Sequence, residues 1–215
     1  MTRIILVRHG QSEANANQIF AGHSDFPLTE FGHKQAALLG KYLKEHEKID
    51  RIYSSDLKRA YQTAIPASEL LGLEIIKTER LREVFAGEWE SKPTSFIEEN
   101  YPEDFNCWRN DFSHVRCTGG ESIIEVYNRI VPAICEISEK NDGRTVLVTS
   151  HATVVRSFFA YAMGLPCDRT AEAPPALNAA MSVFEMDGDK VMSYRFNITD
   201  HLGDMISKAP TKFNA

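Results

Sequence analysis

The chain has 215 residues, of which 43% are hydrophobic and 25% are charged, a composition typical of a globular protein with a substantial core. Its formal net charge of −6 argues against nucleic acid as a partner, because binding to a phosphate backbone requires a basic surface. The N-terminus has no signal-peptide pattern and no apolar run has the length of a membrane span. We therefore expect a cytoplasmic protein that does not bind membranes.

The organisation of the chain predicts one domain over residues 1–215, since no linker rich in Pro, Gly or Ser divides the sequence. The four cysteines have no C-x-x-C spacing, which predicts free thiols rather than disulfides. No other spacing typical of metal ligands is present, so we expect no metal ion.

The first predicted element is a strand over residues 3–7, which contains four consecutive apolar residues. Such a run, rich in β-branched residues, is typical of a strand that is buried on both faces of a sheet. Arg8, His9 and Gly10 follow its carboxyl end, where open α/β sheets have their ligand crevice. A histidine there, next to a permanent cation, is a candidate for chemistry on a phosphate.

The next part of the chain predicts a short helix or turn over residues 11–17 and a loop over residues 20–28. Thr29 is the predicted N-cap of a helix that ends near residue 47, because a threonine side chain can accept a bond from the first helical turn. Apolar residues recur on one face of this helix, which indicates that the face is buried.

Two short strands and a helix are predicted next. The first strand covers residues 49–53, and residues 54–56 (Ser-Ser-Asp) are expected to cap a helix over residues 57–71. Gly72 is expected to end that helix, since glycine adopts the left-handed conformation without strain. A third strand is predicted over residues 74–77.

Residues 80–120 form a long segment without a clear hydrophobic period, in which short helices are predicted near residues 95–99 and 104–111. Irregular segments of this length are uncommon in compact domains and often cover binding sites. We therefore expect a lid-like insertion at about residues 88–120.

The last third of the chain returns to regular elements. Ser122 and Glu125 form a predicted capping box at the start of a helix that runs to about residue 140. Residues 144–149 are the strongest predicted strand after the first, and His151 follows directly.

An apolar helix is predicted over residues 152–163, followed by a hairpin of residues 181–186 and 191–196. The polar tail from residue 197 is expected to pack loosely. Strands alternate with helices over most of the chain, which indicates a mostly parallel central sheet with helices on both faces. The predicted fold class is therefore α/β, a three-layer α/β/α sandwich.

Polar residues follow three of the predicted strands. Arg8 and His9 follow the first, Arg59 lies in the first turn of the helix after the second, and His151 follows the late strand. Because parallel strands end at one edge of a sheet, these side chains are expected to face one pocket, together with two helix N-termini. Guanidinium groups and helix N-termini both favour anions, so the sequence predicts a phosphate pocket.

Catalysis in such a pocket needs a nucleophile and a proton donor. A neutral imidazole can act as the nucleophile, and the charges of Arg8 and Arg59 are expected to keep His9 neutral. Glu83 is the best candidate for the proton donor, because Phe85 and Trp89 lie close to it in the sequence and are expected to desolvate it and raise its pKa.

A set of short motifs runs in order along nearly the whole chain, and together they resemble the histidine phosphatase superfamily, in its phosphoglycerate mutase-like branch. The motifs are Arg8-His9-Gly10, Asn15, Gly22 with Pro27-Leu28-Thr29-Glu30, Ser54-Ser55-Asp56-Leu57 with Arg59, Leu81-Arg82-Glu83 with Gly87-Glu88-Trp89-Glu90, Gly120-Glu121-Ser122 and Ser150-His151. The resemblance implies a phosphoglycerate mutase-like fold.

The resemblance implies a role for each matching residue. His9 would carry the phosphoryl group as a phosphohistidine, and Arg8, Arg59 and His151 would hold that group. Glu83 would act first as the general acid and then as the base that activates water.

Three further residues are expected to contact the substrate or its phosphate, namely Asn15, Gly22 and, through its backbone N–H, Ala152. The family uses no metal, and the resemblance implies no cofactor. The partner it implies is a small phosphorylated metabolite.

The sequence departs from the family pattern at three positions. Gln11 stands where the family usually has Glu, Ala152 where Gly is usual, and Ser91 where a Gly often follows the Gly-Glu-Trp-Glu run. The segment over residues 88–120 is shorter than the insertion of the sugar-phosphate mutases and lacks its adjacent arginines, which favours hydrolysis over mutase chemistry.

The predicted function is therefore a metal-independent phosphatase that hydrolyses a small phosphate monoester. A cofactor-dependent phosphoglycerate mutase and a non-catalytic phosphate-binding protein on the same fold are the alternatives. The sequence does not single out the substrate, and it is compatible with a homo-oligomer.

Overall fold

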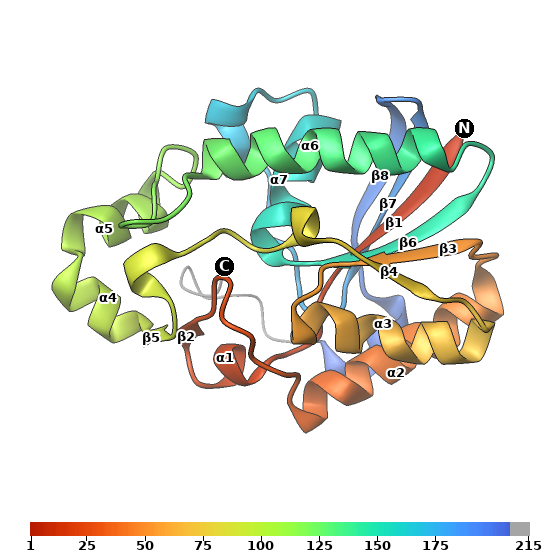
Figure 1. The fold of residues 1–215 in the computed structure, drawn as a ribbon, viewed down its shortest axis with the longest axis horizontal. Coiled ribbons are helices and arrows are strands. Elements are labelled where there is room, and N and C mark those ends of the chain that lie inside the picture. Colours follow the sequence, from red (N-terminus) through yellow and green to blue (C-terminus); the bar gives the residue numbers. More distant parts are fainter. Residues whose placement is uncertain (207–215) are drawn as a thin grey trace.

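A six-stranded sheet forms the centre of the structure, a computed structural model that describes residues 1–206 (Figure 1). Its order across the sheet is β4-β3-β6-β1-β7-β8. The bounds of the strands are β1 Thr2–Arg8, β3 Arg51–Ser54, β4 Ile75–Lys77, β6 Thr145–Ser150, β7 Met181–Asp187 and β8 Lys190–Ile198. The first four run parallel, whereas β7 and β8 form an antiparallel hairpin at one side. The predicted strands and the mostly parallel sheet are confirmed.

The strands end in register at the edge that carries the polar motifs. Arg8 lies opposite Ser150 in the pairing of β1 with β6, and Ser54 lies opposite Thr149 in the pairing of β3 with β6. The residues after these three strands are therefore brought to one edge of the sheet, as the sequence predicts.

Helices cover both faces of the sheet (Figure 1). Helices α2 (Glu30–His46) and α3 (Lys58–Leu71) lie on one face, and α6 (Ile123–Lys140) and α7 (Ala152–Ala162) lie on the other. Strand β1 serves both layers, because successive side chains of a strand point to opposite faces. Ile5 and Val7 join the cluster under α2 and α3, whereas Ile4 and Leu6 join the cluster under α6 and α7. This arrangement confirms the predicted three-layer sandwich.

A smaller group of elements lies beyond the end of the sheet (Figure 1). It consists of α1 (Glu13–Ala16), β2 (Ile19–Phe20), β5 (Lys92–Pro93), α4 (Thr94–Asn100) and α5 (Pro102–Asn110), and β2 pairs antiparallel with β5. Phe20, Trp89, Phe105, Trp108 and Phe112 pack edge to face as one buried aromatic group between these elements. The aromatic group attaches α5 to β2 of the N-terminal segment.

Short 3₁₀ helices complete the description: η1 (Glu79–Leu81), η2 (Gly87–Trp89), η3 (Cys167–Glu172) and η4 (Asp200–Met205). The last of them corrects the expectation of a loosely packed tail. Helix η4 packs against α2, and Leu202 is buried. The rest of the tail, residues 207–215, lies outside the described residues.

The start of α3 differs from the prediction that residues 54–56 cap it. Its N-cap position is Leu57, which makes no side-chain cap bond. The backbone N–H of Lys58 instead donates to Oδ1 of Asp25 at 2.6 Å. Asp56, an expected cap, forms an ion pair with Arg82. The side-chain acceptor at the start of this helix therefore comes from a distant loop.

The predicted caps of α2 and α6 are confirmed. The side chain of Thr29 accepts a bond from Gly32 N, and Ser122 and Glu125 form a reciprocal capping box. Gly72 ends α3 in the left-handed conformation. Within residues 1–206, no helix combines the length and the apolarity that crossing a membrane requires.

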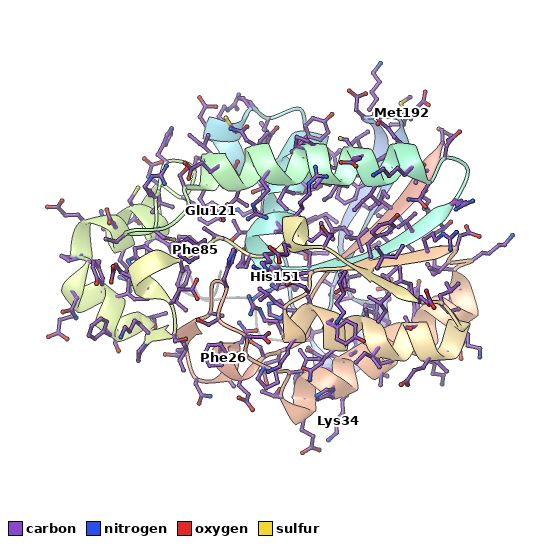
Figure 2. All side chains as sticks on the ribbon, in the orientation of Figure 1. Phe26, Lys34, Phe85, Glu121, His151 and Met192 are labelled. Carbon is purple, nitrogen blue, oxygen red and sulfur yellow. The ribbon has the colours of Figure 1, made fainter. Side chains whose placement is uncertain are left out.

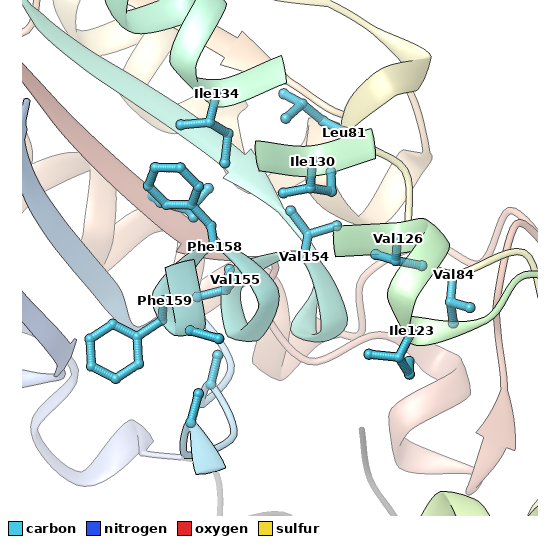
Figure 3. Close-up of a cluster of buried hydrophobic side chains, with 14 of the residues drawn as sticks. Leu81, Val84, Ile123, Val126, Ile130, Ile134, Val154, Val155, Phe158 and Phe159 are labelled. Atoms are coloured by element: carbon cyan, nitrogen blue, oxygen red, sulfur yellow. The ribbon is translucent and has the colours of Figure 1, made fainter. Parts of the chain in front are cut away.

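The aromatic core under α7 allows a test of the packing. Phe158 is fully buried against Phe184, with ring centroids 4.9 Å apart, in the cluster that Figure 3 shows. Phe158→Ala leaves a cavity, so we expect it to lower the free energy of unfolding by about 3–5 kcal/mol. Urea unfolding measures this change, and Met192→Ala on exposed β8 is the control, with an expected change within about 0.5 kcal/mol. Equal stability of Phe158→Ala and the parent chain would contradict this packing.

Candidate active site

The polar residues at the strand ends form one buried cluster. Arg8 and His9 follow β1, Arg59 lies in the first turn of α3, and His151 stands between β6 and α7. All four are buried, and the rings of His9 and His151 meet edge to face with centroids 5.3 Å apart. Figure 2 shows His151 near the centre of the molecule, at the edge of the sheet where β6 ends. The structure thus brings together four of the predicted site residues from three separate segments.

The imidazole of His9 is held in one orientation and kept neutral. Its Nδ1 lies 2.7 Å from the carbonyl oxygen of Gly10, which only accepts hydrogen bonds, so Nδ1 carries the proton and Nε2 keeps its lone pair. Burial, followed by the charges of Arg59 and Arg8, lowers the pKa of His9 well below its ordinary value of 6.5. A neutral imidazole with a free Nε2 lone pair has the chemical properties of a nucleophile.

Two guanidinium groups lie in the same cluster, and within residues 1–206 their hydrogen-bond partners are backbone oxygens. Arg8 donates to Ala176 O at 2.7 Å, and its buried Nε has no partner within residues 1–206. Arg59 donates to Ser24 O at 2.9 Å and to Gly22 O at 2.7 Å. Burial lowers the pKa of each arginine to about 10, so both remain cations at neutral pH. Cations without a carboxylate in direct contact are available to bind an anion.

Glu83 faces these cations from the long segment between β4 and α6. It is 7% exposed, and its Oε1 accepts from Val84 N at 2.9 Å. The negative charge of Glu83 opposes the lowering of the pKa of both Arg8 and Arg59, which places the carboxylate close to both guanidinium groups. A carboxyl group in this position can exchange a proton with a group bound between the arginines.

The aromatic residues near Glu83 in the sequence pack against other rings. Phe85 is exposed and packs on His23, with ring centroids 5.3 Å apart, and Trp89 belongs to the aromatic group with Phe20. Trp108 of α5 and Glu83 line one cavity. Desolvation of the carboxyl group by Phe85 and Trp89 stays a prediction.

Arg129 of α6 holds the backbone of the segment that carries Glu83. Its guanidinium donates to Arg80 O at 2.9 Å, to Arg82 O at 3.0 Å and to Glu83 O at 3.2 Å, and it forms an ion pair with Glu121. These bonds fix the main chain of Glu83 and of the residues before it to α6.

The ring of His151 packs edge to face against the ring of His9. Its Nε2 is 2.9 Å from Ser55 Oγ, and its Nδ1 is buried without a partner within residues 1–206. Burial, followed by the charges of Arg59 and His9, lowers its pKa well below 6.5. The unpartnered Nδ1 is available to a ligand, because buried polar atoms in proteins almost always have a partner.

A cavity opens at this cluster. Of the predicted site residues, Arg8, His9, Asn15, Gly22, Arg59 and Glu83 line it. Ala152 begins α7, and the next residue, Thr153, lines the cavity and points its backbone N–H at Glu83 Oε2 at 3.4 Å. No group of three or more His, Cys, Asp or Glu residues suited to a metal ion occurs within residues 1–206.

The comparisons with known proteins agree with this geometry. The family model of the histidine phosphatase superfamily (branch 1) matches residues 4–199. The chain belongs to this superfamily. Phosphoserine phosphatase 1 of Hydrogenobacter thermophilus is 36% identical over 217 residues, which cover 97% of this chain and 98% of that protein.

Two solved structures of the histidine phosphatase fold show how closely the backbone agrees. YhfR of Bacillus stearothermophilus has a TM-score of 0.88 at 30% identity and covers 94% of this chain and 100% of its own. A mycobacterial glucosyl-3-phosphoglycerate phosphatase, solved with VO3, has a TM-score of 0.80 at 28% identity and covers 91% of this chain and 97% of its own. The chain is a phosphatase of this superfamily, a phosphoric monoester hydrolase, as predicted.

Two departures from the histidine phosphatase pattern have a structural explanation. Ser91 has a φ of +60°, in the region that favours glycine, and its hydroxyl bonds Ser24 Oγ at 2.8 Å. Gln11 accepts a bond from Thr29 Oγ1 at 2.9 Å through its side chain, and its backbone N–H donates to Gln35. Gln11 therefore connects the segment after β1 to the start of α2.

Sequence reasoning gave no role to two groups that support this histidine phosphatase site, although Thr63 belongs to the motif that contains Arg59. Asn178 donates to His9 O at 3.0 Å and to Asn15 Oδ1 at 3.2 Å. Thr63 of α3 accepts from Gly10 N at 3.0 Å and donates to Arg59 O at 2.7 Å. Asn178 lies in an irregular stretch without a motif, so no local signal pointed to it, whereas Thr63 stands four residues after Arg59 on the same helix.

The buried histidines predict how stability depends on pH. The unfolded chain binds protons at His9 and His151 below pH 6.5, while the folded chain keeps both neutral, so the free energy of unfolding falls as the pH drops. The slope is at most about 1.4 kcal/mol per pH unit for each histidine. We expect His151→Asn to reduce this slope between about pH 6.5 and about pH 5.5 in urea unfolding.

The control for this measurement is His33→Asn, at an exposed position of α2, which should leave the slope unchanged. A slope that His151→Asn does not reduce would show that His151 is protonated in the folded chain.

Proposed function

We propose that this phosphatase hydrolyses a small phosphate monoester without a metal ion, through a phosphohistidine on His9. The observation that carries the proposal is the neutral imidazole of His9, with its Nδ1 bonded to Gly10 O, in a buried cluster with two guanidinium groups and the carboxyl group of Glu83. This combination supplies a nucleophile, a clamp for the phosphoryl oxygens and a proton donor.

In the first step, the lone pair of His9 Nε2 attacks phosphorus and the bond from phosphorus to the ester oxygen breaks. Glu83, in its protonated form, gives its proton to that oxygen, and the product leaves as a neutral alcohol. Arg8 and Arg59 bind the equatorial phosphoryl oxygens, whose charge is spread out in the transition state. The phosphoryl group is then bonded to His9, and Glu83 is a carboxylate.

In the second step, the Glu83 carboxylate takes a proton from a water molecule as the water oxygen attacks phosphorus. The N–P bond breaks, inorganic phosphate forms, and the electron pair of that bond returns to Nε2. His9 is neutral again and Glu83 is protonated again, so the cycle closes without a metal ion or a second substrate.

His151 and the start of α7 complete the proposed clamp. The buried Nδ1 of His151 is free to bond a phosphoryl oxygen, and the backbone N–H of Ala152 lies at the N-terminus of α7, where the helix dipole favours negative charge. Asn15 and Gly22 line the same cavity and are assigned to substrate contact.

The proposed substrate is a small phosphorylated metabolite, because the arginines assigned to bind its phosphate are buried and line one cavity. The relative from Hydrogenobacter thermophilus is named phosphoserine phosphatase 1, which makes O-phosphoserine the first ester to test. The four cysteines are free thiols, which supports the proposed location in the reducing cytoplasm.

Replacement of the nucleophile is the direct test. We expect His9→Ala to lose at least about a thousandfold of the hydrolysis of p-nitrophenyl phosphate, since only uncatalysed attack by water remains. The parent chain, quenched during turnover, should contain an acid-labile, base-stable phosphoryl group that His9→Ala lacks, and EDTA should leave its rate unchanged. His33→Ala is the matched control, and near-normal turnover by His9→Ala would refute the proposal.

The role of Glu83 as general acid predicts a dependence on the leaving group. Glu83→Gln cannot donate a proton, so an alkyl phosphate with a poor leaving group should lose about a hundredfold or more in kcat/KM. p-Nitrophenyl phosphate, whose leaving group needs little protonation, should lose much less in the first step. We expect burst kinetics with this ester, because water activation in the second step is also slowed. Equal losses for both esters without a burst would count against general acid catalysis by Glu83.

A further inference from the structure

The carboxylate of Glu90 binds the loop of residues 22–24, whose carbonyls accept hydrogen bonds from Arg59. Its Oε1 accepts from His23 N at 2.7 Å and from Ala86 N at 3.0 Å. Its Oε2 accepts from Ser24 N at 2.7 Å and from Ser24 Oγ at 2.6 Å. Four bonds to one carboxylate fix the position of the loop relative to the segment between Glu83 and Glu90, and bonds to a charged acceptor are stronger than neutral ones.

The same loop holds the guanidinium of Arg59 on its other side. Arg59 donates to Gly22 O at 2.7 Å and to Ser24 O at 2.9 Å. The carbonyl of Gly22 and the N–H of His23 belong to one peptide group, so this peptide joins the Glu90 carboxylate to the Arg59 guanidinium. The N–H end of this peptide dipole faces the Glu90 carboxylate and its C=O end faces the Arg59 guanidinium, so the dipole stabilises both charges.

Close packing at Gly22 fixes the backbone of this loop. Gly22 has a φ of +49°, and a Cβ at this position would lie 2.1 Å from Glu90 Oε1 and 2.7 Å from Ala86 Cβ. The loop backbone therefore lies directly on the carboxylate. Arg59 is 1% exposed, so the loop carbonyls are the contacts that determine where its remaining N–H groups point.

We infer that Glu90 is a positioning residue for the phosphatase reaction. Through the Gly22–His23 peptide it orients the guanidinium of Arg59 toward the transferring phosphoryl group. The inference rests on the proposed role of Arg59 in binding that group. Glu90 bonds the N–H of this peptide and Arg59 bonds its carbonyl, so the negative charge is kept one peptide away from the guanidinium. A carboxylate there orients the arginine without neutralising it by direct contact.

The first test is Glu90→Gln, which keeps the size of the side chain but removes its charge and one acceptor oxygen. In either orientation the amide nitrogen would face at least one backbone N–H group, so one or two of the four bonds are lost. We expect kcat/KM for p-nitrophenyl phosphate to fall by about tenfold to a hundredfold and inhibition by orthovanadate to weaken by a similar factor. The control is Glu88→Gln, an exposed position in the same motif, which should match the parent chain.

Assays run well below the thermal midpoint of each variant separate this role from a structural one. A Glu90→Gln protein that is folded, by its near-ultraviolet circular dichroism, and binds vanadate as tightly as the parent chain would overturn the inference. Glu90→Asp keeps the charge on a shorter side chain and should recover part of the lost vanadate affinity, which a loss caused by unfolding would not show.

A double-mutant cycle with Arg59→Lys tests whether Glu90 affects the activity through Arg59. If Glu90 acts through Arg59, Glu90→Gln should reduce kcat/KM by no more than about twofold in the Arg59→Lys background. Fully multiplicative losses would overturn the inference and leave the proposed function intact. A fully active Arg59→Lys would instead remove the proposed role of Arg59, and the role of Glu90 with it.

Discussion

Burial of two arginines beside a neutral imidazole is the constraint on which this site depends. Removing a guanidinium from water is costly unless its N–H groups find acceptors, and Arg8 and Arg59 are 2% and 1% exposed. The chain supplies backbone carbonyls for this purpose, from Ala176 in one case and from Gly22 and Ser24 in the other. Carbonyls offset the desolvation while leaving the full positive charge, and burial together with that charge keeps His9 unprotonated.

The fold determines which segments can supply these groups. Parallel strands ending in register bring Arg8, His9 and His151 to one edge, and the helices that follow β3 and β6 begin at the same place. The sheet gives these residues rigid support, because β1 is buried on both faces. The acid and the loop carbonyls come from irregular segments, which are in turn tied to helices by Arg129 and Asp25.

How much of the structure could be predicted from the sequence depends on how far apart in the chain the interacting residues lie. The apolar run of residues 4–7, the Thr29 cap and the capping box at Ser122 are local signals, and each correctly predicted its element. The role of Glu83 was predicted from its motif. The guanidinium that binds its backbone carbonyl belongs to Arg129, 46 residues further along the chain, and no local signal indicates that contact. Asp25 caps a helix that lies beyond another helix and a strand, and nothing in the local sequence indicates such a pairing.

The bond from Arg59 to the Gly22–His23 peptide also bears on how a chain with a net charge of −6 can attract a dianion. Several of its acidic side chains form ion pairs with arginines, namely Glu98, Glu121 and Glu125. The carboxylate that stabilises this loop binds backbone N–H groups and a hydroxyl, while the guanidinium of Arg59 is held by carbonyls and keeps further N–H groups for an anion. A small group of arginines held in this way can give an acidic protein a pocket that favours phosphate.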